Sequence, residues 1–110
     1  MKVAVVGSRE VTVEGMERYL PSETTEIISG GAKGVDTCAA AYANAHGIPL
    51  TIFLPQYEKY GKSAPLKRNL QIIEAAELVI AFWDGQSRGT KYVIDQCKMR
   101  HKSIRIILVE

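Results

Sequence analysis

Short apolar runs alternate with amphipathic, helical patterns along the whole chain. Most of these runs are rich in β-branched residues and end at glycine, proline or aspartate, which is typical of buried strands. The sequence predicts five strands, at Lys2–Val6, Thr25–Ser29, Leu50–Leu54, Leu78–Trp83 and Ile104–Val109. No turn signal joins two neighbouring runs into a hairpin, so the strands are expected to be parallel.

Helical spacing of apolar residues fills the intervals between these runs. Thr12 can cap the first helix, Gly47 ends the second, and Pro65 suits the first turn of the third. The predicted helices are Thr12–Leu20, Val35–His46, Pro65–Ala76 and Arg88–Arg100. The polar segment Gln56–Ser63 is predicted to be the longest loop. This alternation predicts an α/β fold with a five-stranded, mainly parallel sheet that is covered on both faces.

The composition narrows the class of protein. The 110 residues are expected to form a single domain, and 46% hydrophobic with 24% charged residues is ordinary for a globular protein. No apolar stretch is long enough for a membrane span, and the first residues are too short a run for a secretory signal. Cys38 and Cys97 lack metal-ligand spacing and are predicted to be small buried thiols, so a cytoplasmic location is expected. The net charge of +2 does not by itself indicate nucleic-acid binding.

The turns after the predicted strands carry the candidate chemistry, because ligands of parallel sheets collect at the carboxyl ends of the strands. Three turns combine glycine, a hydroxyl and a basic residue: Gly7–Arg9, Ser29–Gly34 and Asp84–Thr90. One such turn usually only reverses the chain, but three on one edge favour an anion site, since glycine allows close approach and the next helix begins with free N–H groups. The predicted ligand-binding residues are Gly7, Ser8, Arg9, Ser29, Gly30, Gly31, Lys33, Gly34, Asp36, Arg68, Asn69, Asp84, Ser87, Gly89 and Thr90.

Two common phosphate-binding motifs are absent. Gly7 is followed by Ser8-Arg9-Glu10, so the G-x-G-x-x-G of dinucleotide-binding folds is missing. Gly61-Lys62-Ser63 resembles the end of a P-loop, but the first glycine of that motif would fall at Gln56. The predicted anion site therefore follows neither pattern.

The sequence leaves the roles of four polar residues near these turns open. Asn69 falls on the apolar stripe of its helix, so it either braces neighbouring turns or touches the ligand. Arg68 projects to the opposite side of the helix, which is consistent with a solvated role. Asp36 lies in the first turn of a helix, where it either stabilises the helix dipole or bonds a ribose hydroxyl. Asp84 is ambiguous in the same way.

Catalytic constellations are sparse in the sequence. His46 and His101 fall near helix ends without a nucleophile or ligand partner, which favours structural roles. Trp83, Tyr57 and Tyr60 could stack on a base or serve packing. No spacing of histidine, cysteine or carboxylate residues indicates a metal site, and no cofactor is expected.

The blocks Gly7-Ser8-Arg9, Ser29–Asp36, Arg68-Asn69 and Gly89-Thr90 resemble the SLOG superfamily, which joins the DNA-processing Smf/DprA proteins, the cytokinin-activating LOG proteins and many short stand-alone domains. The resemblance covers nearly the whole chain, is most specific in the S-G-G-A-x-G-[VI]-D block, and is closest to the stand-alone members. It implies a Rossmann-like three-layer sandwich and a nucleotide or nucleotide-derived ligand. The ligand phosphate or ribose would lie against the turns after the second and fourth strands.

The chain also departs from its relatives. LOG hydrolases carry P-G-G-x-G-T-x-x-E near the fourth strand, and the position of the glutamate is Val93 here. Asp95 lies about 200° further round the helix and cannot replace it. Hydrolysis by the LOG mechanism is therefore not expected, and any catalytic role would fall to Asp36 or Asp84. The length leaves no room for the additional domains of the DNA-processing proteins.

The leading expectation is a sensor or accessory module that binds a nucleotide or an ADP-ribose-like molecule. A nucleotide-processing hydrolase, with LOG-like N-glycosidic or related cleavage, is the first alternative. Single-stranded DNA binding through Arg9, Lys33, Lys67, Arg68 and the loop tyrosines is the second. A homodimer is expected as well, because a sheet of this size has a small core.

Overall fold

The computed structural model describes residues 1–109. Its strands are β1 (Lys2–Gly7), β2 (Glu26–Ser29), β3 (Leu50–Ile52), β4 (Leu78–Trp83) and β5 (Ser103–Leu108). They form one sheet in the order β3-β2-β1-β4-β5, and every neighbouring pair is parallel. The predicted α/β fold with a parallel sheet is therefore confirmed. β1 and β4 lie at its centre and are buried on both faces, as their continuous apolar sequences require.

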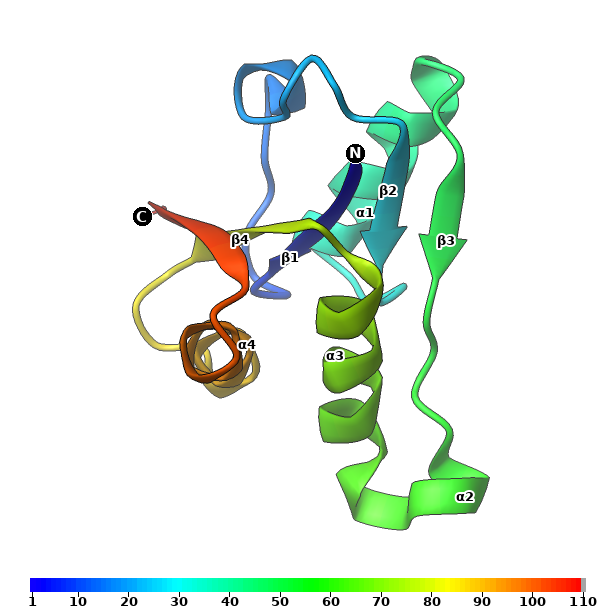
Figure 1. Ribbon diagram of the computed structural model, residues 1–110, viewed down its shortest axis with the longest axis vertical. Coiled ribbons are helices and arrows are strands. Elements are labelled where there is room, and N and C mark those ends of the chain that lie inside the picture. Colours follow the sequence, from blue (N-terminus) through cyan, green and yellow to red (C-terminus); the bar gives the residue numbers. More distant parts are fainter. Residues whose placement is uncertain (110) are drawn as a thin grey trace.

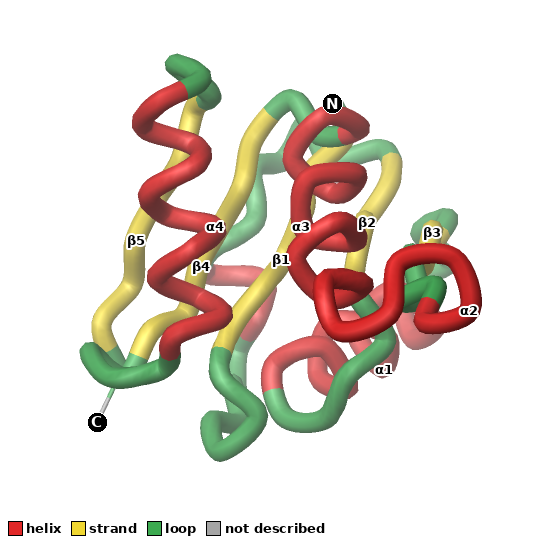
Figure 2. The backbone as a smooth tube through the Cα atoms, turned by 90° about the horizontal axis from the view of Figure 1, so that it is seen from below, coloured by secondary structure: helices red, strands yellow, loops and turns green. Residues whose placement is uncertain are grey.

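Helices cover both faces of the sheet and complete a Rossmann-like sandwich. They are α1 (Val35–Ala45), α2 (Tyr57–Tyr60), α3 (Ala64–Ala75) and α4 (Arg88–Met99), with 3-10 turns at Met16–Arg18 and Gly61–Ser63. Figure 2 shows α3 and α4 side by side over one face, with α1 behind the sheet on the other. The short α2 lies beyond the sheet, at the start of α3 (Figure 1). Across residues 1–109, no helix is long and apolar enough to cross a membrane.

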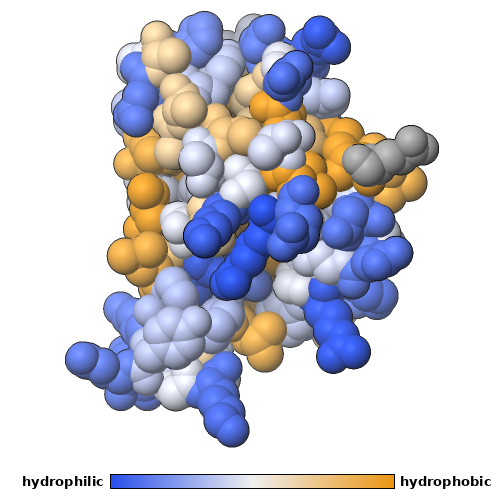
Figure 3. Space-filling model, turned by 180° about the vertical axis from the view of Figure 1, so that it is seen from behind, coloured by the Kyte–Doolittle hydropathy of each residue, from blue (hydrophilic) through white to orange (hydrophobic). Residues whose placement is uncertain are grey.

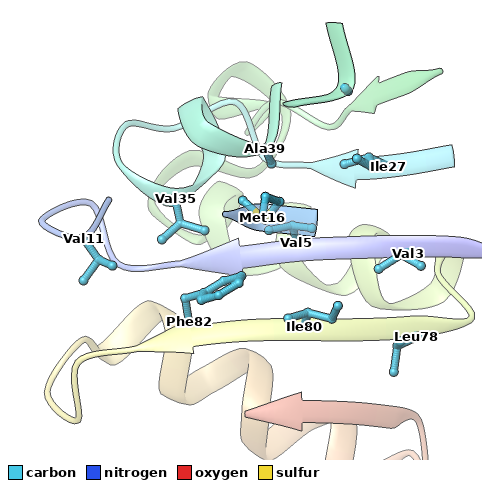
Figure 4. Packing of buried hydrophobic residues seen from close by; sticks show 11 residues of the cluster. Val3, Val5, Val11, Met16, Ile27, Val35, Ala39, Leu78, Ile80 and Phe82 are labelled. Atoms are coloured by element: carbon cyan, nitrogen blue, oxygen red, sulfur yellow. The ribbon is translucent and has the colours of Figure 1, made fainter. Parts of the chain in front are cut away.

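The core consists of two layers, one on each side of the sheet. Alternate residues of β1 point to opposite faces, so Val3 and Val5 join the layer under α1 while Ala4 and Val6 join the layer under α3 and α4. Figure 4 shows the first layer, in which Phe82 of β4 is fully buried. Burying a side chain of this size contributes about 1.5–3 kcal/mol. These layers fix β1 and β4 and therefore the position of the turns that follow them.

The predicted helix at Thr12–Leu20 is wrong, because only Met16–Arg18 forms a single 3-10 turn there. Gly15 precedes that turn with a φ of 66°, a left-handed backbone that cannot continue an α-helix. Tertiary contacts hold the segment instead. Met16 is buried against the α1 layer, and the amide of Val13 donates to Sγ of Cys38 at 3.4 Å.

Two further predictions need correction. The expected loop Gln56–Ser63 contains α2 and the second 3-10 turn, which lead directly into α3. The strand expected at Leu50–Leu54 ends at Ile52. The ends of the other predicted strands and helices shift by a single residue or not at all. Cys97 is buried as predicted, and burial raises the pKa of its thiol, whereas Cys38 is only half-buried.

Apolar side chains remain exposed at both edges of the sheet. Figure 3 shows them along the β3 edge and near the C-terminal end of the chain. Ile52 and Leu54 are exposed at the first edge, and Leu108 at the second. An edge strand with exposed apolar residues is a common place for another chain to pair.

Gly34 gives a test of the packing between the loop after β1 and the start of α1. It has a φ of +73°, and a Cβ at this position would lie 2.6 Å from the carbonyl oxygen of Ser8 and 2.5 Å from that of Arg9. We expect Gly34→Ala to lower the free energy of unfolding by about 1–3 kcal/mol for a backbone with φ 73° and ψ −121°, which residues other than glycine rarely adopt, and by about 1–3 kcal/mol more for the forced contacts.

Gly47→Ala is the matched control, because Gly47 has a φ of +64° but a Cβ there would meet nothing within 4 Å. It should show only the backbone cost. Urea unfolding of both variants measures the difference, and equal losses would contradict a close contact at Gly34.

Candidate functional site

A cavity lies where the order of the strands reverses. β1 and β4 are neighbours at the centre of the sheet, but the chain after β1 packs on the α1 side while the chain after β4 enters α4 on the other side. Ligands of parallel α/β sheets bind at such a reversal, outside the carboxyl ends of the strands. The cavity here measures about 500 Å³, within the usual range for small-molecule sites. In Figure 2 the N-terminal ends of α3 and α4 lie at this edge, on either side of the loop after β1.

The structure brings most of the predicted ligand-binding residues to this cavity. They come from the loop after β1, the turn before α1, the first half of α3 and the turn before α4. The predicted residues that line it are Gly7, Ser8, Arg9, Gly30, Asp36, Arg68, Asn69, Asp84, Ser87, Gly89 and Thr90. Parallel strands align their carboxyl ends, so segments far apart in the sequence meet at one opening.

Four of the predicted residues do not line the cavity. Ser29 is buried and Lys33 is exposed, while Gly31 has a φ of +71° and faces the side chains of Ile52 and Leu54. Gly34 lies against the loop after β1. In this structure these residues shape the turn between β2 and α1, and a direct role in binding stays a prediction for them.

Two of the glycines at the cavity, Gly7 and Gly30, are closely packed. A Cβ at Gly7 would lie 2.5 Å from Cγ2 of Val35 and 2.8 Å from the carbonyl oxygen of Phe82. A Cβ at Gly30 would lie 2.7 Å from Nη1 of Arg68 and 3.2 Å from Oδ2 of Asp36. Gly7 therefore lets β1 approach α1, and Gly30 leaves room for a charged pair of side chains.

Arg68 points toward the cavity rather than into solvent, which corrects the role expected from its position on the helix. Its Nη1 donates to the carbonyl oxygen of Gly30 at 2.7 Å, and its Nε donates to Oδ1 of Asn69 at 2.9 Å. The side chain therefore reaches from α3 to the turn after β2. Asn69 is buried and bonds Arg68, so the bracing interpretation of this amide has a partner.

Asp36 is a buried carboxylate at the start of α1. Its Oδ2 accepts from the amide of Ala32 at 3.0 Å, which closes the turn after β2. Burial raises the pKa of Asp36, and the Ala32 amide and the positive charge of Arg68 oppose that rise. Burial likewise lowers the pKa of the Arg68 guanidinium, against the attraction of Asp36. The two groups thus compensate each other's charge only in part.

Asp84 organises the turn that leads into α4. Its Oδ1 accepts from the amides of Gln86 at 2.9 Å and Ser87 at 2.8 Å. These hydrogen bonds are the largest cause of the lowered pKa of Asp84. The carboxylate is therefore ionised at neutral pH.

The first turn of α4 presents free amides to the cavity. Ser87 caps the helix weakly, since its Oγ accepts from the amide of Thr90 at 3.5 Å. Within residues 1–109, the amides of Arg88 and Gly89 donate to no protein acceptor. A Cβ at Gly89 would meet nothing within 4 Å, so the backbone there is open to a ligand. Free amides at a helix N-terminus attract anions.

Ser8 is 3% exposed and lies in the wall of the cavity. Its Oγ is buried and forms no hydrogen bond to any residue that the structure describes. An unpaired buried hydroxyl destabilises a folded protein by about 1–3 kcal/mol. The sequence predicted Ser8 as a ligand-binding residue. It could not predict that the hydroxyl lacks a partner, because that depends on three-dimensional packing.

Sequence reasoning missed the apolar wall of the cavity. Pro65, Leu66 and Ile72 of α3 and Val93 of α4 form this wall, together with Val6 below them. These residues belong to the apolar stripes of α3 and α4. The sequence could have indicated the wall through the apolar residues of these stripes nearest the carboxyl ends of the strands. One side of the cavity is thus polar and the other apolar.

Few groups at the cavity could perform catalysis. Glu10, Asp36 and Asp84 are the carboxylates that line it, but Val93, at the position of the LOG glutamate, is apolar and 2% exposed. The residues described contain no group of three histidine, cysteine or carboxylate side chains that could hold a metal ion. His46 stacks on Tyr42 with ring centres 4.2 Å apart, consistent with the structural role expected of it.

The predicted aromatic residues lie outside the cavity lining. Tyr57 and Tyr60 are in α2, and Lys59 and Lys67 place their ammonium groups 5.1 and 6.0 Å from the ring centre of Tyr60. Nε1 of Trp83 donates to the carbonyl oxygen of Ser87 at 3.1 Å. Trp83 therefore supports the turn before α4.

The buried charge of Asp36 gives a test by pH. Its raised pKa means that the folded state binds the proton more tightly than the unfolded state, above the usual value of 3.8. The free energy of unfolding then falls as the pH rises from that value through the raised pKa. Asp36→Asn has no proton to release, so the difference between variant and parent should shift in favour of the variant as the pH rises.

Denaturant unfolding at several pH values, from about pH 3 to about pH 7, measures this shift. Asp95→Asn, which removes an exposed carboxylate on α4, is the control for the loss of one charge. A difference that stays constant with pH, or that moves against the asparagine variant, would contradict the burial of an ionised Asp36.

Comparison with known proteins places the chain in a family. The family model described as DNA recombination-mediator protein A matches residues 1–100. No curated protein and no solved structure matches the chain. The match spans the whole sheet except the last strand, and it agrees with the resemblance to the Smf/DprA branch of the SLOG superfamily. The chain belongs to the DNA recombination-mediator protein A family.

Proposed function

We propose that the chain binds a single nucleotide or nucleotide-derived molecule, with a phosphate and a ribose, in the cavity at the reversal of strand order. It would act as a sensor or accessory module. The observation that carries this proposal is the buried, unpaired hydroxyl of Ser8 in the wall of a cavity that free helix amides also face. A bound ligand supplies the missing partner.

The polar side of the cavity suits an anionic group. Gly89, whose amide donates to no acceptor in residues 1–109, lines it, and Arg9 and Arg68 contribute positive charge to the lining. Backbone amides at a helix N-terminus bind phosphate through hydrogen bonds and the helix dipole together. The open space at Gly89 allows a phosphate to reach these amides.

The apolar side of the cavity suits a flat, weakly polar group. Pro65, Leu66 and Ile72 of α3 and Val93 of α4 form this part of the lining. A nucleobase has apolar faces that such a wall can contact, as the aliphatic lining of many small-molecule sites does. A volume of about 500 Å³ accommodates one nucleotide.

Single-stranded DNA binding is a second candidate because of the family to which the chain belongs. Basic and aromatic side chains lie together on α2 and α3, where Lys59 and Lys67 approach the ring of Tyr60. Such a combination can hold a nucleic-acid strand. A gel shift with short single-stranded DNA at low salt tests this candidate, since phosphate contacts weaken as salt rises.

Hydrolysis of the ligand has no specific support. Asp36 is occupied by the amide of Ala32, and Asp84 by two backbone amides. A homodimer also stays a prediction, and the exposed apolar residues at the edges of the sheet are the surface that it would use.

Ser8→Ala tests the nucleotide proposal. The variant removes an unpaired buried hydroxyl, so the midpoint of thermal unfolding should stay unchanged or rise. Nucleotide affinity should fall about threefold to tenfold, the effect of one hydrogen bond. Isothermal titration calorimetry with a panel of nucleoside mono- and diphosphates measures the affinity. A loss of stability with unchanged affinity would show that the serine is structural.

Gly89→Leu tests the free amides of α4. The backbone at Gly89 has room for a side chain, so the fold should tolerate leucine while the cavity loses access to the amides. Nucleotide binding should then drop below detection. Ala41→Leu, at an exposed position of α1 away from the cavity, is the matched control and should bind as the parent does. Undiminished binding by Gly89→Leu would place the phosphate elsewhere.

A further inference from the structure

The lining of the cavity carries acidic as well as basic side chains. Glu10, Asp36 and Asp84 are present beside Arg9 and Arg68. A site for the backbone of a nucleic-acid strand needs a clear excess of positive charge along a track. This cavity has no such excess among its lining side chains. Its ligand therefore has to offer hydrogen-bond donors to carboxylates as well as an anionic group to the helix amides.

One oxygen of Asp84 is available for such a donor. Oδ1 accepts both backbone amides of the turn, at 2.9 and 2.8 Å. Oδ2 accepts neither of these amides and stays accessible to a further donor. Since Asp84 follows β4 and Ser8 follows the neighbouring β1, the two side chains share one side of the opening.

The neighbouring Ser8 hydroxyl is the second available group. It is buried, forms no hydrogen bond with the residues that the structure describes, and lies with Asp84 in the lining of the cavity. A carboxylate oxygen only accepts hydrogen bonds, whereas a serine hydroxyl both donates and accepts. A pair of adjacent hydroxyls on a ligand matches this arrangement, because one can donate to Asp84 while the other bonds Ser8.

We propose that Asp84 and Ser8 recognise the vicinal 2′,3′-hydroxyls of a ribose, so that the cavity selects ribonucleotides over deoxyribonucleotides and over strands of DNA. The selection rests on the proposed function of nucleotide binding and adds the sugar as its determinant. A phosphate is excluded from this position by repulsion from the ionised carboxylate. A 2′-deoxyribose leaves one of the two protein groups without a partner.

Titration calorimetry with matched pairs of ligands tests the selection. The ligands are the four nucleoside 5′-monophosphates, their 2′-deoxy counterparts, and a 20-nucleotide single-stranded DNA. We expect the ribonucleotides to bind at least about tenfold more tightly than their deoxy counterparts, the effect of one charge-assisted hydrogen bond. DNA should bind no more tightly than the deoxynucleotides.

Asp84→Asn is the informative variant. The carbonyl oxygen of asparagine can still accept the amides of Gln86 and Ser87, and the NH₂ group replaces only the free oxygen. The ratio of deoxyribonucleotide to ribonucleotide dissociation constants should fall toward one, while the thermal midpoint stays within a few degrees of the parent. Asp95→Asn on α4, which lies outside the cavity lining, should keep the ratio of the parent.

The outcomes separate this inference from the proposed function. Equal binding of ribo- and deoxyribonucleotides, or an unchanged ratio in Asp84→Asn, overturns the ribose selection but leaves nucleotide binding intact. Tighter binding of DNA than of any ribonucleotide overturns the selection and favours the strand-binding candidate. Absence of binding by every nucleotide overturns both proposals.

Discussion

The backbone after β1 lies directly against the backbone before α1, and the cavity depends on this contact. Gly34 faces the carbonyl oxygen of Ser8, and Gly7 faces Val35 and the carbonyl oxygen of Phe82. At Gly34 no side chain separates the two segments, because glycine lacks the Cβ that would lie between them. The amide of Ser8 also donates to the carbonyl oxygen of Phe82 at 3.3 Å, which joins the loop to β4. Backbone contacts thus position Ser8, and its buried hydroxyl forms no hydrogen bond with the residues that the structure describes.

The apolar pattern of the sequence was sufficient to predict the strands at the centre of the sheet. The runs at Lys2–Val6 and Leu78–Trp83 are apolar throughout because both of their faces are covered, and a parallel centre follows from that pattern. The segment Thr12–Leu20 shows where the reasoning fails. Met16 and Leu20 have helical spacing because both contact the core under α1, not because the segment is helical. Gly15 was the signal against a helix there.

The candidate site was predictable only in part for a related reason. The turns after the strands could be placed together, since parallel strands end at one edge of the sheet. The direction of Arg68 could not, because helical geometry gives the direction of the Cα–Cβ bond and not the path of a long side chain. Its partner is the backbone carbonyl of Gly30. Every residue has such a carbonyl, so the sequence does not indicate which one Arg68 binds. The unpaired state of Ser8 and the free oxygen of Asp84 likewise depend on distances between separate turns.

Two features that lower the stability of the free protein occur in the wall of one cavity. The hydroxyl of Ser8 is buried without a partner, and the carboxylate of Asp36 is buried with only partial compensation from Arg68. A folded chain of this size has a small margin of stability, so unfavourable groups of this kind are not expected from packing alone. Local departures from good packing tend to collect where a protein binds its ligand. A ligand that donates to carboxylates and bonds a serine hydroxyl removes part of this unfavourable energy when it binds, and that gain contributes directly to its affinity.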